Sequence, residues 1–202
     1  MKLPIKQVRV ALTIAIVLAV TTATLPALAR HRSLSTAALD PAAPTAVVHL
    51  RDATATVAFS PRGQGQNLVV KAISAAKAQV LVQAYGFSNT AILKALVDAK
   101  YRGVDVRVIL DRSNDKGRYS GATYMSNAGI PVWIDYKPAI AHNKVIVIDS
   151  RDVITGSFNF TEAAQEHNAE NVLFLQDVVD LAAVYAKDWQ WRLSASRQFR
   201  SK

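Results

Sequence analysis

The chain has 202 residues, half of them hydrophobic, and carries a formal net charge of +9 at pH 7. This length suits one globular domain with terminal extensions, and the hydrophobic content excludes a chain that is disordered throughout. The positive charge favours polyanionic partners such as nucleic acid or anionic lipid, although a merely soluble basic protein has the same balance. The chain has no cysteine, which excludes disulfides, thiolate chemistry and cysteine-type zinc sites.

The first 29 residues have the pattern of a secretory signal peptide. Lys2, Lys6 and Arg9 form a positively charged start, and residues 10–20 are an apolar run. Ala27 and Ala29 then supply small residues at the two positions that a signal peptidase reads. The apolar run is shorter than the roughly 20 residues that a transmembrane helix needs. We therefore expect cleavage after Ala29, a secreted or periplasmic location, and no stable membrane association. An uncleaved membrane anchor is the alternative.

Residues 30–53 are rich in Ala, Pro, Ser and Thr without sustained periodicity, which predicts a flexible linker. Residues 54–202 have the pattern of one folded domain. Strands are expected at residues 54–60, 78–87, 104–111, 132–135, 144–149, 153–160 and 171–176. Helices are expected at 65–77, 89–103, 122–129 and 178–193, with Ser88 as the cap of the second and a turn at 150–152. Strands that alternate with helices predict a layered α/β domain whose sheet is covered on both faces.

Polar residues stand at the ends of two apolar runs near the middle of this domain. His142 and Lys144 are two residues apart, so on an extended chain they point to the same side. Ser157 and Asn159 have the same spacing. If the two strands pair through the short turn after Asp149, all four side chains converge at one edge of the sheet. Asp149 has the opposite parity to Lys144, which favours a structural anchor over a reacting group.

The residue types in this set suit chemistry on a phosphate group. Lys144 is a point charge for a phosphate oxygen, Ser157 and Asn159 add neutral donors, and Gly156 allows close approach of the backbone. His142 can attack phosphorus as a neutral imidazole or protonate a leaving oxygen as imidazolium. No paired carboxylates stand nearby in the sequence to hold two metal ions. The set therefore predicts metal-independent phosphoryl transfer, with no metal and no cofactor.

From His142 to Asn159 the sequence reads H-x-K-x4-D-x6-G-S-x-N. This pattern resembles the signature of the phospholipase D superfamily without a gap, and six specified residues at fixed spacing are a specific signal. "VQAYGF", "VRVILDRSN" and "GSFNFTEAAQEHNAEN" extend the resemblance, over residues 54–192, to the small secreted bacterial endonucleases of that superfamily. It implies an α/β/α sandwich with a mixed central sheet covered by helices on both faces, and one motif per chain.

The resemblance also implies a role for each motif residue. His142 would be the nucleophile that forms a phosphohistidine, and Lys144 and Asn159 would bind the non-bridging phosphate oxygens with support from Ser157. Glu170 matches the family's acid that orients a catalytic imidazole, either on its own chain or on a partner. Asp149 belongs to the motif, but we expect its role to be structural.

A two-step displacement needs a second histidine to protonate the leaving group. The other histidines, His31, His49 and His167, do not begin an H-x-K. A second copy of the chain is the simplest source of the missing half-site. We therefore expect a homodimer with both His142 side chains at the two-fold axis.

Residues outside the motif have weaker assignments. Arg112, Lys116 and Arg118 lie in a loop that either contacts the phosphate backbone of a substrate or is simply solvated. Gln83 either reaches the site or is structural. Five aromatic residues are expected in the core or a dimer interface: Tyr85, Phe87, Trp133, Trp189 and Trp191. Four basic residues are expected to form a solubilising tail: Arg192, Arg197, Arg200 and Lys202.

The function predicted from these features is a secreted, metal-independent endonuclease that hydrolyses DNA with little sequence preference, with RNA left open as a substrate. No recognition helix or zinc-finger spacing indicates base reading, whereas a basic cleft would bind the backbone. A membrane-anchored phospholipid phosphodiesterase with the same site is one alternative. A nucleic-acid-binding module with an inactive site is the other.

Overall fold

The computed structural model describes residues 46–115 and 120–201. The predicted signal peptide, most of the predicted linker, and Lys116 and Arg118 lie outside the described residues. The described residues all belong to one compact unit, Leu34–Lys202. Within this described part of the chain, no helix is long and apolar enough to cross a membrane.

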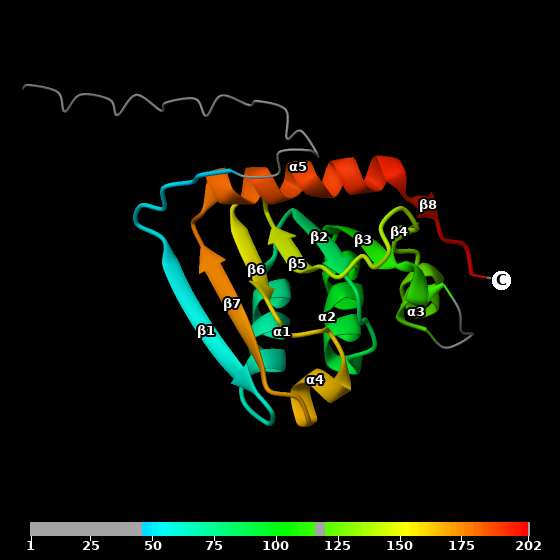
Figure 1. Ribbon diagram of the computed structural model, residues 1–202, viewed down its shortest axis with the longest axis horizontal. Coiled ribbons are helices and arrows are strands. Elements are labelled where there is room, and N and C mark those ends of the chain that lie inside the picture. Colours follow the sequence, from blue (N-terminus) through cyan, green and yellow to red (C-terminus); the bar gives the residue numbers. More distant parts are fainter. Residues whose placement is uncertain (1–45, 116–119, 202) are drawn as a thin grey trace, which may run out of the picture. The chain divides into compact units, whose positions relative to one another are not determined.

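Eight described strands form a single sheet in the order β1-β7-β6-β5-β2-β3-β4-β8 (Figure 1). They are β1 (Thr54–Ser60), β2 (Gln79–Ala84), β3 (Asp105–Asp111), β4 (Val132–Asp135), β5 (Lys144–Ile148), β6 (Asp152–Gly156), β7 (Glu170–Gln176) and β8 (Arg197–Gln198). β2, β3 and β4 pair in parallel, and the other neighbours pair antiparallel. The sheet is therefore mixed, as expected.

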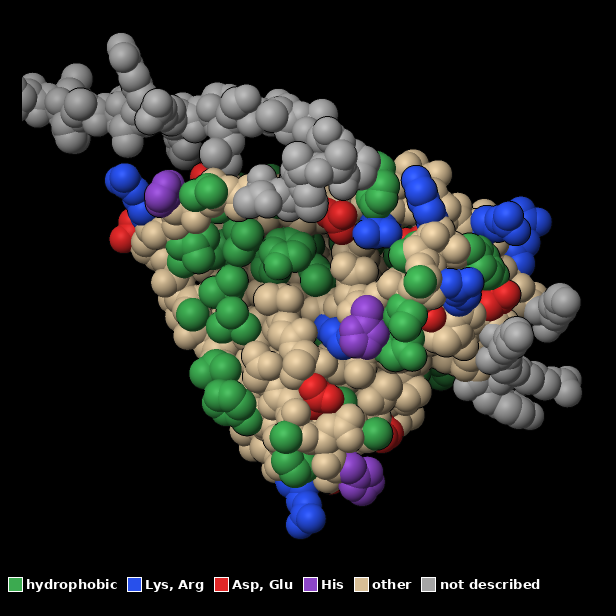
Figure 2. Space-filling view, viewed as in Figure 1, with side chains coloured by type: hydrophobic (Ala, Val, Ile, Leu, Met, Phe, Trp, Pro, Cys, Tyr) green, Lys and Arg blue, Asp and Glu red, His purple; other side chains and the backbone are tan. Residues whose placement is uncertain are grey.

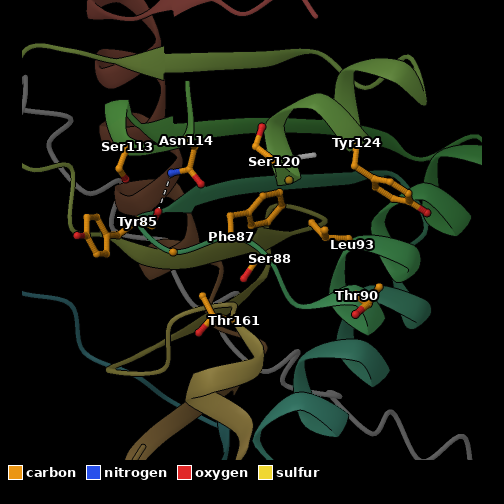
Figure 3. Close-up of a pocket in the computed structure, with 12 residues that line it drawn as sticks. Tyr85, Phe87, Ser88, Thr90, Leu93, Ser113, Asn114, Ser120, Tyr124 and Thr161 are labelled. Carbon is orange, nitrogen blue, oxygen red and sulfur yellow. Dashed lines mark hydrogen bonds between the residues drawn. The ribbon is translucent and has the colours of Figure 1, made fainter. Parts of the chain in front are cut away.

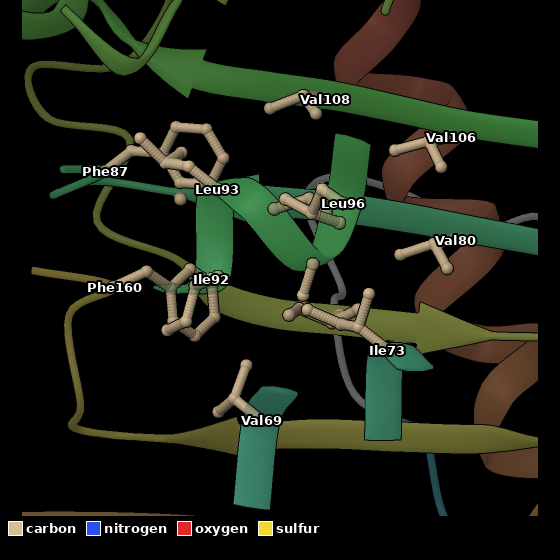
Figure 4. Packing of buried hydrophobic residues seen from close by; sticks show 14 of the residues in the cluster. Val69, Ile73, Val80, Phe87, Ile92, Leu93, Leu96, Val106, Val108 and Phe160 are labelled. Atoms are coloured by element: carbon tan, nitrogen blue, oxygen red, sulfur yellow. The ribbon is translucent and has the colours of Figure 1, made fainter. Parts of the chain in front are cut away.

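Helices cover both faces of this sheet, which confirms the predicted α/β/α layering. They are α1 (Gly65–Ala75), α2 (Thr90–Tyr101), α3 (Gly121–Asn127), α4 (Glu162–Glu166) and α5 (Val179–Ala195), with a 3₁₀ turn, η1, at Arg112–Asn114. α1, α2 and α3 pack on one face in a large apolar cluster, part of which is drawn in Figure 4. Ile92, Leu96 and Phe160 are fully buried there, and each such side chain contributes roughly 1.5–3 kcal/mol through burial.

The other face is covered by α5 through a second apolar cluster. Trp189 is its anchor, with 1% of its surface exposed. Its indole Nε1 donates to the Val82 carbonyl oxygen at 3.0 Å, and its ring meets Trp133 edge-on at 6.2 Å between centroids. A buried indole needs such a partner for its N–H, so the hydrogen bond ties α5 to β2.

The middle strand β5 reads as a continuous apolar run because both of its faces are buried. All five of its residues, Lys144 included, are buried. β5 joins β6 through a tight turn in which Asp149 and Ser150 have φ of +52° and +55°. The Arg151 N–H donates to the Ile148 carbonyl, which closes a type I′ hairpin turn. The turn thus begins one residue before the expected position, and Asp152 already belongs to β6.

Each expected strand and helix is present, but the strand expected at 153–160 ends at Gly156, so Ser157 and Asn159 follow β6 instead of belonging to it. Three further details differ from the sequence prediction. The N-cap of α2 is Asn89, whose side chain accepts from the Ile92 N–H, and not Ser88. α4 was not expected; Thr161 caps it and Glu162 lies in its first turn. β8 was not expected either, and it pairs with β4, so Arg197 belongs to the sheet and not to a solubilising tail.

The outer strand β1 exposes apolar side chains. Val57 and Phe59 keep 53% and 63% of their surface accessible. They pair with Leu173 and Asn171 of β7, on the face that α5 leaves open at this edge of the sheet. Figure 2 shows hydrophobic side chains gathered over these two strands.

Candidate active site

A hollow of about 370 Å³ lies where β5, β6 and β7 end at one edge of the sheet. It is lined by His142, Lys144, Gly156, Ser157, Asn159 and Glu170. The sequence predicted the convergence of His142, Lys144, Ser157 and Asn159 from strand parity. The tertiary structure supplies it because β6 pairs antiparallel with β5 and β7 pairs antiparallel with β6, which places the end of β6 between the starts of β5 and β7.

Lys144 is the buried charge of this hollow. It begins β5, and only 8% of its surface is exposed. Its Nζ lies 2.9 Å from the His142 carbonyl oxygen, 3.0 Å from His142 Nδ1 and 5.4 Å from the centre of the Tyr85 ring. Burial lowers the pKa of Lys144 below its usual value, and the negative charge of Glu170 partly offsets this effect. The ammonium therefore gains from any anion that enters the hollow.

His142 is exposed just before β5. Its ring packs on Tyr85 at 4.6 Å between centroids and 54° between planes. An ammonium can only donate, so the contact with Lys144 makes Nδ1 of His142 the acceptor and places the proton of a neutral ring on Nε2. The imidazole is thus held between an aromatic ring and a cation, with its outer edge open to solvent.

The segment after β6 brings two neutral donors to the same hollow. Gly156 has φ of +143°, and a Cβ there would lie 2.2 Å from the Asn171 carbonyl oxygen, so only glycine fits. The backbone N–H groups of Ser157 and Phe158 both donate to that carbonyl, while Ser157 Oγ accepts from the Asn171 N–H. The Ser157 hydroxyl keeps its own proton for a ligand.

Asn159 has an unused side-chain amide. Its Oδ1 is buried without a hydrogen-bond partner, and its side chain makes no hydrogen bond to another described residue. A buried amide left without partners costs about 1–3 kcal/mol. The Oδ1 atom can only accept a hydrogen bond, whereas the side-chain Nδ2, which makes no hydrogen bond to another described residue, is the group that can donate to an anion in the hollow.

Glu170 begins β7 and lines the hollow opposite Lys144. Its Oε1 accepts from the Asn168 Nδ2 at 3.2 Å. Among the described residues it makes no hydrogen bond to His142, so the carboxylate does not orient the imidazole of its own chain in this state. The expected role of Glu170 stays a prediction, with the partner chain's histidine as its other candidate.

Asp149 lies at the opposite end of β5 and does not line the hollow. Its carboxylate accepts the N–H groups of Lys77, Ala78 and Gln79 at 2.7–2.9 Å. Burial acts to raise the pKa of Asp149, but these three donors and the nearby Arg151 outweigh it, and the pKa lies below its usual value. The carboxylate fastens the β5–β6 turn to the segment between α1 and β2.

The loop that delivers His142 is held by the end of β3. Asp111 is almost fully buried, and its carboxylate accepts the N–H groups of Ala141 at 2.7 Å and Ser113 at 2.8 Å. The Arg112 guanidinium donates to the carbonyls of Pro138 and Ala139. The expected phosphate contact of Arg112 stays a prediction, and those of Lys116 and Arg118 concern residues outside the described part.

Gln83 points away from the hollow. It is buried, and its Nε2 donates to Asp188 of α5 at 3.2 Å. Of the two roles predicted for Gln83, this contact supports the structural one. Trp191 lies at the surface, where Lys137 and Arg192 stand over its ring. Arg192 is also within 3.4 Å of the buried Asp135, so it packs into the domain and is not part of a tail.

Two residues at the site were missed by sequence reasoning. Tyr85 was expected in the core or an interface, yet its ring touches His142. Asn171 fixes the Ser157 segment. The quoted segments "VQAYGF" and "NAEN" contain both residues, but only the sheet order places β2 and β7 on either side of the hairpin.

The described residues contain no group of three or more His, Asp or Glu side chains that could hold a metal ion. What the hollow offers an anion is one buried ammonium, one hydroxyl, one free amide and one imidazole. Such donors in a partly buried site stabilise the charge of a phosphoryl group. The arrangement suits capture of a phosphate next to a nucleophilic ring nitrogen.

Comparison with known protein families decides the relationship. The model described as "Cardiolipin synthase, PLD-like domain" matches residues 69–193, more than half of the chain. The chain belongs to the phospholipase D superfamily. It is therefore a hydrolase of the phosphodiesterase type. The pattern that contains His142, Lys144 and Asn159 is the part of the sequence that indicated this superfamily.

Curated relatives of this phospholipase D-like chain carry lipid-related names. It is 43% identical over 150 residues to a protein named phospholipase D from Rickettsia prowazekii, covering 74% of this chain and 73% of that one. For the phospholipase D of Rickettsia felis the identity is 47% over 131 residues, or 65% of each chain, just under two thirds of the relative's length. Human mitochondrial cardiolipin hydrolase is 34% identical over 118 residues, 47% of its length.

Solved structures give the same fold. The phospholipase D family member Nuc from Salmonella typhimurium aligns with a TM-score of 0.71 and 41% identity, covering 74% of this chain and all of Nuc. NucT from Helicobacter pylori aligns over its whole length with a TM-score of 0.66 at 24% identity, which supports the fold alone. The part of the phospholipase D-like chain that aligns is therefore a complete domain in both relatives.

Proposed function

We propose that this phospholipase D-like protein is a secreted, metal-independent endonuclease that hydrolyses phosphodiester bonds of DNA with little sequence preference. The observation that carries the proposal is the hollow in which the His142 imidazole, the buried Lys144 ammonium and the free Asn159 amide meet. The similarity to Nuc over that protein's entire length supports it. So does the charge of the chain after Ala29, which keeps 21 Lys and Arg against 15 Asp and Glu, a net +6, because a basic chain binds a polyphosphate backbone without reading bases.

The first chemical step begins when a phosphodiester enters the hollow. Its non-bridging oxygens accept from Lys144, Ser157 and Asn159, which draws the ammonium away from His142 Nδ1. The single proton of the neutral ring then moves from Nε2 to the vacated Nδ1 by exchange with solvent, where it donates to a carboxylate, for which Glu170 of either chain is the candidate, and Nε2 is left unprotonated. Nε2 attacks phosphorus, the P–N bond forms, and the bond to the leaving oxygen breaks.

The leaving oxygen needs a proton, and the second step needs a base. The hollow contains one histidine, so we assign both tasks to the His142 of a second copy of the chain. As imidazolium it protonates the leaving oxygen, and as imidazole it takes a proton from water, whose oxygen attacks phosphorus, so that the P–N bond breaks and the nucleophilic His142 is released. The sum is one diester and one water converted to a monoester and an alcohol. The exposed Val57 and Phe59 on β1 offer apolar surface of the kind that homodimers bury.

The proposed dimer can be tested by mixing wild-type and variant chains and by measuring the mass of the active species. Wild-type chain mixed and refolded with a tenfold excess of His142→Ala chain should lose most of its activity, because mixed dimers have one histidine. Analytical ultracentrifugation under assay conditions should show a dimer. Full activity from a species that sediments as a monomer would remove the two-histidine assignment.

A substrate panel tests the endonuclease itself. The purified chain is given plasmid DNA, RNA and phosphatidylcholine vesicles separately, each with and without EDTA. We expect plasmid nicking and linearisation that EDTA leaves largely intact, and no cleavage by His142→Ala, which should still bind DNA. Complete loss of wild-type cleavage with EDTA would contradict metal-independent chemistry.

A phospholipid phosphodiesterase is the second candidate, and the names of the rickettsial phospholipases D and the mitochondrial cardiolipin hydrolase favour it. The same hollow would accept the phosphate of a lipid head group. The vesicle arm of the panel, repeated with cardiolipin, separates the two candidates. Release of head group at rates above those for DNA would replace the endonuclease proposal with the lipid one.

A further inference from the structure

A second pocket, of about 450 Å³, lies beside the catalytic hollow and has no role in the steps above. The loop after β2 and the start of α3 form much of its wall (Figure 3). Its size falls within the roughly 300–1,000 Å³ that is typical of small-molecule sites. We refer to it as the neutral pocket, because none of the described residues that line it is charged.

The neutral pocket and the catalytic hollow share a wall. Tyr85 lines the neutral pocket, and its ring packs on His142 at 4.6 Å. Gly86 lines it too, and a Cβ at that position would lie 3.2 Å from the Asn159 side chain. A group attached to a phosphate held by Asn159 is therefore next to the mouth of this pocket.

The wall is held in place by backbone contacts. The Asn114 amide donates to the Tyr85 carbonyl at 2.7 Å, as drawn in Figure 3, and the Phe160 N–H donates to the Gly86 carbonyl at 3.1 Å. A Cβ at Gly121 would lie 2.1 Å from the Phe87 carbonyl oxygen, so α3 packs directly on this loop. The pocket is thus formed before any ligand arrives, which limits the entropy cost of binding.

The lining combines hydrogen-bonding groups with aromatic rings. Its polar side chains are those of Ser88, Thr90, Ser113, Asn114, Ser120 and Thr161. The hydroxyls of Ser88 and Ser113 make no hydrogen bond to another described residue. The Tyr124 ring, 48% exposed, stands at the opposite rim from Tyr85 in Figure 3. Hydroxyl and amide groups suit the edges of a nucleobase, and an exposed ring suits its face.

We propose that the neutral pocket is a subsite for the nucleoside next to the scissile phosphate, in which Tyr124 stacks on the base and Ser88 borders it. The inference rests on the proposed endonuclease function. A lipid acyl chain fits the pocket less well, because the hydroxyls of Ser88 and Ser113, which make no hydrogen bond to another described residue, would lose hydrogen bonds to water without replacement. A phosphate fits it poorly, because none of the described residues that line it is a cation. A nucleobase is neutral, partly polar and flat, so it fits both the hydrogen-bonding groups and the exposed aromatic ring of the pocket.

Two chromogenic diesters with the same leaving group isolate the nucleoside's contribution. Methyl p-nitrophenyl phosphate has no nucleoside, whereas the 5′- and 3′-(p-nitrophenyl) phosphates of thymidine place one on either side of the phosphorus. The quantity measured is the ratio of kcat/KM for each thymidine ester to kcat/KM for the methyl ester. We expect the wild-type ratio to be at least tenfold in favour of one thymidine ester.

Variants of two pocket residues test the location. Ser88→Trp fills the pocket from an exposed position whose side chain makes no hydrogen bond to another described residue, and should lower the favoured ratio about tenfold or more. Tyr124→Ala should lower it roughly fivefold or more, since base stacking on a ring has about this effect, and Tyr124→Phe should keep it. Ser74→Trp, at an exposed position of α1, is the matched control and should keep the wild-type ratio. Thermal unfolding of each variant shows whether it is folded.

The outcomes separate this inference from the proposed function. Plasmid cleavage by the wild type with unchanged ratios in folded Ser88→Trp and Tyr124→Ala overturns the subsite and leaves the endonuclease intact. A wild type that prefers neither thymidine ester overturns the subsite whatever it does to plasmid. A wild type that hydrolyses the methyl ester but not DNA overturns the endonuclease, and with it the inference.

Discussion

The two ends of β5 carry polar residues of the same signature motif, yet they are in opposite states. At one end, the Asp149 carboxylate accepts three backbone N–H groups, which use most of its roughly four acceptor positions. At the other, Lys144 is buried beside His142, and the Asn159 amide near it makes no hydrogen bond to another described residue. A satisfied polar group holds structure, whereas a buried group with unused capacity stores free energy that a ligand releases. This difference separates architecture from chemistry within one motif.

The substitution with the largest expected effect removes the nucleophile. His142→Ala should lower kcat for a phosphodiester by about 10⁴-fold or more, because the covalent route is lost. The free energy of unfolding should change by less than about 0.5 kcal/mol, since the side chain is exposed. Single-turnover hydrolysis and urea denaturation measure the two quantities. His167→Ala, at another exposed histidine, is the control, and a comparable rate loss there would undermine the assignment.

Lys144→Met keeps the aliphatic stem and removes the charge. We expect kcat/KM to fall by about 10²–10³-fold, which is typical when one donor to a reacting phosphoryl or oxyanion is lost. Stability should stay equal or rise, because burial already penalises the ammonium, as its lowered pKa shows. Steady-state kinetics and thermal unfolding test both halves. A clear loss of stability with little loss of rate would place Lys144 on the structural side of the comparison.

Asp149→Ala should lower stability and leave the rate largely unchanged, which is the reverse of the effect expected for Lys144→Met. Three backbone donors would lose their acceptor, so we expect a loss of roughly 2–4 kcal/mol in unfolding free energy, with kcat within about threefold of wild type below the melting temperature. Asp180→Ala, on an exposed first-turn position of α5, should cost only about 0.5 kcal/mol. Denaturation curves and assays at low temperature decide between these outcomes.

The stability lost in Asp149→Ala should depend on pH in a definite direction. The folded pKa of Asp149 lies below its usual value, so its stabilising contribution is present above the unfolded pKa of about 3.9 and disappears as pH falls through the folded pKa. The stability difference between wild type and Asp149→Ala should therefore be constant near neutral pH and narrow below about pH 4. A difference that persists at lower pH would show that the carboxylate's charge is not what matters.

The smallest expected effect is a displacement of the pH–rate profile by Glu170→Gln. Lys144 must be protonated to neutralise the phosphate, and burial brings its alkaline limb below that of an ordinary lysine. Glu170 raises the pKa of Lys144, so removing its charge should move the alkaline limb of kcat/KM to lower pH. The limb should stay in place in a matched Glu166→Gln variant on α4. An unmoved limb in Glu170→Gln would show that the two groups are not coupled during turnover.

Local sequence predicted most of the contrast between the two ends of β5, because periodicity and parity are properties of a few consecutive residues. The alternation around His142 and Lys144, the apolar run of β5 and the fixed distance to Ser157 and Asn159 needed only strand geometry. The details that failed depended on competing local choices. Asn89 replaces Ser88 as cap because its side chain bonds both the Ile92 N–H of the helix and the distant Gln66 and Glu162.

The sequence by itself determined the superfamily, the layered α/β class and the six residues of the motif, since each follows from residue types at fixed spacing. The tertiary structure alone decided that Tyr85 of the β2 loop packs on His142, that Asn171 fixes the Ser157 segment, and that a neutral pocket adjoins the hollow. The physical reason is the sheet order, in which β2 and β7 lie on either side of the β5–β6 hairpin although far from it in sequence. Contacts between strands that are distant along the chain leave no periodic signal within any one of them.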